Sequence, residues 1–99
     1  MPKFYVKKTS VGDMPNTLIF KGKSVEGVIK SGMILEIPLM GASDIIPVQI
    51  KEIVFFENQT DELKKEGLVA DFSKYPEDME VIQELNIADE ELVVSEEKL

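Results

Sequence analysis

Short runs of alternating apolar and polar residues recur along the first half of the chain. In KFYVKKT (3–9), Phe4 and Val6 share one face, while Tyr5 and Lys7 share the other. Alternation with a period of two, in runs rich in aromatic and β-branched residues, is typical of half-buried strands. We predict four such strands, in KFYVKKT (3–9), TLIFKGK (17–23), SVEGVIK (24–30) and MILEIPL (33–39).

The longest apolar run, IIPVQIKEIVFFE (45–57), changes phase part-way along. Val48 and Ile50 alternate with polar neighbours, but the residues from Ile53 to Phe56 are all apolar. One extra residue in one strand of a pair shifts the alternation in this way. The run therefore predicts a long strand, with either a bulge near 51–53 or burial on both faces.

Two glycines in the first half mark places where the chain changes direction. Gly32 follows Ser31 between two apolar runs, and we expect it to supply the positive φ of a hairpin turn. Gly27 lies inside the run 24–30, where a missing side chain lets a strand bend as a barrel closes.

The second half contains the helical signals. NQTDELKKEG (58–67) predicts a short helical turn near 60–66, because Thr60 or Asp61 can cap it and Gly67 can end it. LVADF, which follows directly, predicts a short strand over 68–72.

The stretch YPEDMEVIQELNI (75–87) has two interpretations. Pro76 suits a first helical position, and Met79, Ile82 and Leu85 then recur at helical spacing. The same letters also fit a one-turn helix over residues 76–79 and then a strand over 80–87. We favour the second interpretation, for the reason given below.

Together these signals predict an all-β fold. About five to seven short strands, with turn signals every 8–12 residues or so, indicate a small closed or nearly closed β-barrel. We expect one barrel domain over residues 1–87. Residues 88–99 form an acidic C-terminal tail, which either is flexible or adds a final strand.

The net charge of −8 comes entirely from the end of the chain. Residues 1–76 contain ten lysines and ten acidic residues, whereas residues 77–99 contain nine acidic residues and one lysine. A charge run of this kind is most often a solvated tail. The alternative is that the acidic end folds over a lysine-bearing surface, or repels nucleic acid.

Two glycine-containing stretches, TLIFKGKSVEGVIKSGMILEI and VQIKEIVFFENQTDELKKEGLVADF, carry a resemblance to a known family. Their order and glycine spacing resemble the second domain of elongation factor Tu and other translational GTPases, over residues 17–72. The matching positions are Gly22, Gly27, Ile29, Gly32, Ile50, Ile53, Phe56, Asp61 and Gly67. The resemblance implies a small β-barrel with a further strand after PEDM, and a role in translation. A phosphate-binding loop is missing, since KGKS (21–24) lacks the preceding glycine and helix that such a loop needs.

Composition argues against most catalytic chemistry. The chain has no Cys, which excludes thiol chemistry, and no His, the side chain that titrates near neutral pH. It also has no Arg, whose guanidinium is the usual group for binding a phosphate through two hydrogen bonds. The paired carboxylates fall in turns or in the tail, where we expect contact with water to leave their pKa values unshifted. We predict a protein that is not an enzyme, with no catalytic residue, no cofactor and no metal. No apolar run reaches the roughly 18 residues of a membrane span, and we expect a cytoplasmic protein without a membrane partner.

The remaining hypotheses concern binding. The first is a stand-alone barrel that binds or regulates an as yet unknown protein partner. The alternative is a module associated with RNA or the ribosome, which uses the lysines of the N-terminal region. The candidate contact residues are Lys3, Tyr5, Lys7, Lys8, Lys21 and Lys23.

Overall fold

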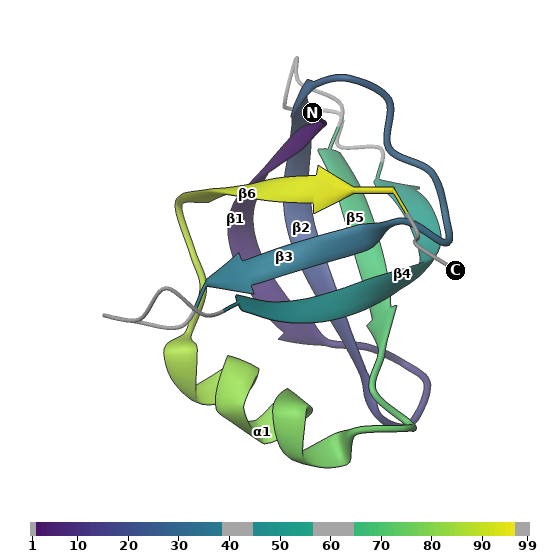
Figure 1. Ribbon diagram of the computed structural model, residues 1–99, viewed down its shortest axis with the longest axis vertical. Coiled ribbons are helices and arrows are strands. Elements are labelled where there is room, and N and C mark those ends of the chain that lie inside the picture. Colours follow the sequence, from purple (N-terminus) through teal and green to yellow (C-terminus); the bar gives the residue numbers. More distant parts are fainter. Residues whose placement is uncertain (1, 39–44, 57–64, 97–99) are drawn as a thin grey trace.

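The computed structural model describes residues 2–38, 45–56 and 65–96. Within these ranges, six strands form a closed antiparallel barrel in the order β1-β2-β5-β4-β3-β6, and one helix, α1, lies across one end (Figure 1). The elements are β1 (Lys3–Val11), β2 (Thr17–Glu26), β3 (Ile34–Pro38), β4 (Ile45–Phe56), β5 (Lys65–Asp71), α1 (Pro76–Leu85) and β6 (Glu90–Ser95). The prediction of a small closed all-β barrel is confirmed, and its one short helix among the described residues lies over 76–85.

The alternating apolar residues fill the barrel. Phe4, Val6, Leu35 and Ile37 are fully buried, because alternate side chains of each strand point to its interior. The other buried apolar residues are Leu18, Phe20, Ile29, Val48, Ile50, Leu68, Ala70, Phe72, Ile82, Ile87, Leu92 and Val94. The core is therefore continuous from the barrel to α1.

The phase change in β4 is a bulge. The pairing of β4 with β5 shifts between Ile50 and Glu52, so that Lys51 is the extra residue. The buried Ile50 is thereby followed by Ile53 as the next residue packed against the core. The predicted bulge near 51–53 is confirmed.

The second and third predicted strands are one strand. β2 continues through Gly22 to Glu26, and residues 28–30 lie outside any strand. Gly27 follows the end of β2 with φ of 73°, so it ends the strand instead of bending one. A branched side chain is strained at this φ, which explains why glycine stands there.

Gly32 has a positive φ of 92°, but it does not form a hairpin between neighbouring strands. β3, which follows it, pairs with β4 and β6 and not with β2. The Gly32 backbone N–H donates to the carbonyl oxygen of Ile50 at 2.7 Å, and the Ile50 N–H donates to Met33 at 2.8 Å. The turn therefore extends the ladder between β3 and β4.

The predicted helical turn near 60–66 lies mostly outside the described residues. Its last two positions, Lys65 and Glu66, belong to β5. Gly67 is also part of β5, where it pairs with Lys21 of β2 and Val54 of β4, so the prediction that it ends a helix is wrong.

The helical interpretation of 75–87 is correct, and the favoured strand over 80–87 is wrong. Pro76 occupies the N-terminal turn of α1, followed by two acidic residues that suit the positive end of the helix dipole. Ile82, within α1, is fully buried against the barrel. Asn86 ends the helix with φ of 49°, in the left-handed conformation that asparagine tolerates well.

The acidic end of the chain contributes a strand to the barrel. β6 pairs with β1 on one side and with β3 on the other, and thereby closes the sheet. Its Leu92 and Val94 side chains are buried, while Glu90 and Glu91 are exposed. The barrel thus continues beyond residue 87.

Candidate functional site

The candidate lysines lie on the outer face of β1 and β2. Cross-strand pairing places Lys8 opposite Lys21, and Tyr5 opposite Lys23. Lys7, Lys8 and Lys23 are exposed. The structure therefore brings the sequence-predicted contact residues onto one pair of strands.

A bulge in β1 explains why two consecutive lysines both face the solvent. The pairing of β1 with β2 shifts between Val6 and Lys8, which leaves Lys7 as the extra residue. Gly22 lies opposite this bulge. A Cβ atom at Gly22 would overlap the Tyr5 carbonyl oxygen and would lie 3.1 Å from the Lys7 backbone nitrogen. The two strands approach this closely only because residue 22 has no side chain.

Acidic residues at the start of β6 cover part of this lysine surface. The Lys3 ammonium lies 3.6 Å from a Glu91 carboxylate oxygen, and the Lys7 ammonium lies 3.5 Å from Asp89. The Tyr5 hydroxyl donates a hydrogen bond to the same Asp89 carboxylate at 2.8 Å. Three of the six candidate contact residues are thus engaged by β6 and the residue before it.

The Tyr5 and Asp89 pKa values reflect this contact. Donation of the Tyr5 hydroxyl to Asp89 raises the pKa of that hydroxyl above its usual value. The same hydrogen bond, aided by the charge of Lys7, lowers the pKa of the Asp89 carboxyl. Both groups are moved away from neutral pH, so this contact has the features of an ion-pair cluster and not of an acid–base pair.

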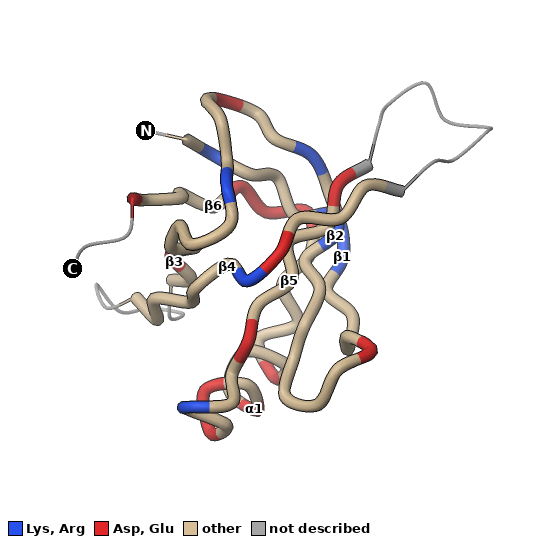
Figure 2. Tube along the Cα trace, turned by 90° about the vertical axis from the view of Figure 1, so that its right-hand side faces the viewer, with Lys and Arg blue, Asp and Glu red and all other residues tan. Residues whose placement is uncertain are grey.

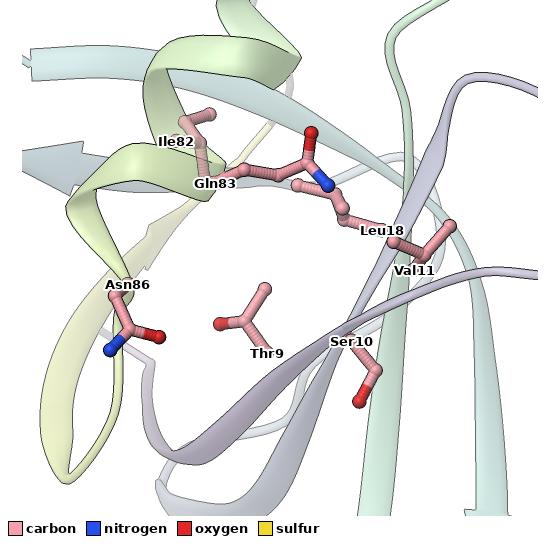
Figure 3. Close-up of a pocket in the computed structure, with 7 residues that line it drawn as sticks. All are labelled: Thr9, Ser10, Val11, Leu18, Ile82, Gln83 and Asn86. Carbon is pink, nitrogen blue, oxygen red and sulfur yellow. The ribbon is translucent and has the colours of Figure 1, made fainter.

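A second feature is a hollow of about 130 Å³ between α1 and the β1–β2 pair (Figure 3). It is lined by Thr9, Ser10, Val11, Leu18, Ile82, Gln83 and Asn86. Leu18 and Ile82 lie fully buried beneath the hollow, whereas 62% of Val11 is exposed, so the hollow opens to solvent beside Val11.

Polar side chains surround the hollow. The Gln83 carboxamide points into it from α1, and the Thr9 side chain points into it from β1 (Figure 3). The Thr9 hydroxyl donates to the Ile87 carbonyl oxygen at 2.9 Å, which fixes the segment after α1 against β1. Sequence reasoning missed this hollow, because it needs α1 to be a helix docked on the barrel.

Several positions along α1 are acidic (Figure 2). Residues 76–96 contain eight acidic residues and no basic residue. Glu80 and Glu84 lie three residues before and one residue after Gln83, and all three side chains are exposed. Residues three and four apart are neighbours on a helix surface, so Glu80 lies beside Gln83, whereas Glu84 lies on another face of α1.

The described part of the chain contains neither a metal-binding cluster nor a membrane-spanning helix. Across residues 2–38, 45–56 and 65–96, no group of three or more acidic side chains is arranged to hold a metal ion. In the same part of the chain, no helix is long and apolar enough to cross a membrane.

Comparisons with known proteins identify no relative of this chain. No protein-family model matches the chain, and neither a curated protein nor a solved structure is significantly similar to it. The barrel and its surfaces are therefore the basis for any functional argument.

Proposed function

We propose that this protein is a non-enzymatic binding or regulatory module that contacts a protein partner. The observation that supports this most is the pairing of the β1 lysines with Asp89 and Glu91. A polyanion such as RNA would have to displace these carboxylates to reach Lys3 and Lys7, and it would approach a chain with a net charge of −8.

The proposal that the module is not an enzyme has its own support. The sequence contains no histidine and no cysteine, so serine or threonine would lack the usual base. Among the described carboxyls with a shifted pKa, Asp71 and Asp89 are both lowered, which is the wrong direction for a general acid.

The alternative function is an RNA- or ribosome-associated module. The opposed pair Lys8 and Lys21 supports it, since two neighbouring ammonium groups suit a phosphate backbone. The sequence resemblance to the second barrel domain of elongation factor Tu supports it as well. That resemblance concerns glycine spacing, which unrelated barrels also meet.

Affinity capture from the native cells separates the two functions. The tagged protein is purified with and without ribonuclease, together with a Lys7→Glu/Lys8→Glu variant as the matched control. We expect a protein partner that survives ribonuclease and is retained by the variant. Recovery of ribosomal components that are lost after ribonuclease, and lost in the variant, would overturn the proposal.

A further inference from the structure

The second half of β4 has one side to which no described residue is paired. β3 pairs with β4 from Ile45 to Gln49, and the backbone hydrogen bonds of Ile50 with residues 32 and 33 extend this ladder. From Glu52 to Phe56, β4 pairs with β5 on one side, and none of the described residues pairs with its other side. We call this stretch the β4 edge (Glu52–Phe56).

The residues along the β4 edge suit the addition of another strand. Positions 53–56 are Ile, Val, Phe and Phe, which all favour strands, and they include neither a charge nor a proline. Lysine, proline and covering segments are the usual protection of a sheet edge against pairing with another chain. The side chain of Phe55 adds an apolar contact surface, because 71% of this residue is exposed.

The distribution of charge favours a second copy of this chain as the occupant. Residues 77–99 carry the whole net charge of −8, whereas residues 1–76 contain equal numbers of lysines and acidic residues. Figure 2 shows that the described ends of β4 and β5 lie away from the acidic helix α1. Two copies that meet at the β4 edge therefore keep their acidic helices apart.

The sequence of the β4 edge is self-complementary in the arrangement that a two-fold axis imposes. Identical strands related by such an axis in one sheet pair antiparallel. With the axis at Val54, the centre of the edge, Ile53 of each copy lies opposite Phe55 of the other. Cross-strand pairs of an aromatic and a β-branched residue stabilise antiparallel strands. Lys51 and Glu52 then lie outside the apolar centre, and neither faces its own copy.

From these observations we infer that this protein forms a two-fold symmetric dimer, in which the β4 edges of two copies pair antiparallel about Val54. The sheet β1-β2-β5-β4 then continues into the second copy. The inference goes beyond the proposed function and does not depend on it. Because only a few residues of each copy pair, the interface belongs to the small, transient class, and we expect half of the protein to be dimeric at roughly 0.1 mM.

Sedimentation velocity of the full chain tests for the dimer. Oligomerisation follows mass action, so a series from about 0.01 to 0.5 mM should shift the protein from monomer to dimer. A protein that stays monomeric throughout this series would overturn the inference.

A pair of matched variants locates the contact. Phe55→Lys places a charge on the β4 edge and should weaken the dimer roughly tenfold or more. Val28→Lys is the control, because Val28 is 70% exposed, lies outside any strand, and gives the same change in net charge. Far-ultraviolet circular dichroism checks that both variants are folded. Equal dimerisation of the two variants would show that the β4 edge is not the interface.

A single introduced cysteine tests the register. The chain has no cysteine, so Val54→Cys places one thiol opposite the same thiol of the second copy. Directly opposite Cβ atoms lie about 4.5–5.5 Å apart in an antiparallel pair, close to the reach of a disulfide. Oxidised glutathione as the oxidant should therefore link Val54→Cys into dimers faster than Val28→Cys, although residue 28 is the more exposed of the two. Equal or slower linking at position 54 would overturn the pairing about Val54.

Discussion

Replacement of Gly22 by alanine tests the close approach of β1 and β2 that places Lys7 and Lys8 on the surface. The added Cβ would overlap the Tyr5 carbonyl oxygen and would lie 2.9 Å from its carbonyl carbon. These are backbone atoms of a strand that is hydrogen-bonded to β2 and β6, so they cannot move independently. Overpacking of this kind costs about 1–3 kcal/mol.

A smaller effect opposes this cost. Alanine in a strand is more favourable than glycine by about 0.5–1 kcal/mol, because glycine loses more conformational freedom on folding. Because the clash involves backbone atoms, its cost lies at the upper end of the overpacking range. We therefore expect a net loss of about 2 kcal/mol in the free energy of unfolding. For a domain of this size, that corresponds to a fall in Tm of about 8–16 °C.

Thermal unfolding followed by far-ultraviolet circular dichroism measures this fall. Lys23→Ala, at an exposed position on the same strand, is the matched control and should change the unfolding free energy by less than about 0.5 kcal/mol. If Gly22→Ala unfolds within about 2 °C of the wild type, β1 and β2 do not approach each other as closely as described.

Three further predictions use other parts of the fold. Gly27→Val should lower the urea midpoint of unfolding, since valine at φ of 73° costs about 1–3 kcal/mol and its Cβ would lie 3.0 Å from Pro2. An unchanged midpoint would contradict the barrel geometry. Asp71 has a lowered pKa, so its stabilising contribution is present above about pH 4 and is lost as the pH falls through the folded-state value. Asp71→Asn should therefore lose less stability than the wild type between about pH 4 and pH 2 in thermal scans, and an equal loss would refute this assignment. Asp89→Asn should lower the pKa of the Tyr5 hydroxyl toward its ordinary value of about 10. The Tyr5 ring signals in an NMR titration measure this pKa, and an unchanged value would show that the two side chains are not in contact in solution.

The barrel could be predicted because its strands have a recognisable local sequence pattern. Phe4 and Val6 alternate with polar neighbours, and the slip in this alternation after Ile50 marks the bulge in β4. The bulge at Lys7 left no such mark. Lys7 and Lys8 are both polar, so an extra residue there produces no break in the apolar pattern.

The helix shows where local signals are insufficient. Ile82 is the fully buried residue of α1, and its spacing from Met79 and Leu85 fits a helix, whereas Leu85 and Ile87, on either side of a polar residue, also fit a strand. The resemblance to the elongation factor barrel favoured a strand, and the structure has a helix. With a strand there, Gln83 and Asn86 had no predicted relation to Thr9, so the hollow had no sequence signal.

The lysine surface was predicted only as a set of residues. That Lys3 and Lys7 meet Glu91 and Asp89 depends on β6 pairing with β1, across more than eighty residues of sequence. Charge counts alone left a solvated tail and a folded-over segment as alternatives. The hydrophobic Leu92 and Val94 decide between them, because burial of their side chains in the barrel holds the acidic residues in place.

The most direct test of the proposed function is a measurement of RNA affinity. A fluorescein-labelled single-stranded RNA is titrated with the wild-type protein at low salt, and anisotropy is recorded. We predict no saturable binding, because the Glu91 and Asp89 carboxylates pair with Lys3 and Lys7. Saturable micromolar binding that weakens with salt, with a slope of about −0.7 for each lysine contact, and that Lys7→Glu/Lys8→Glu abolishes, would contradict it.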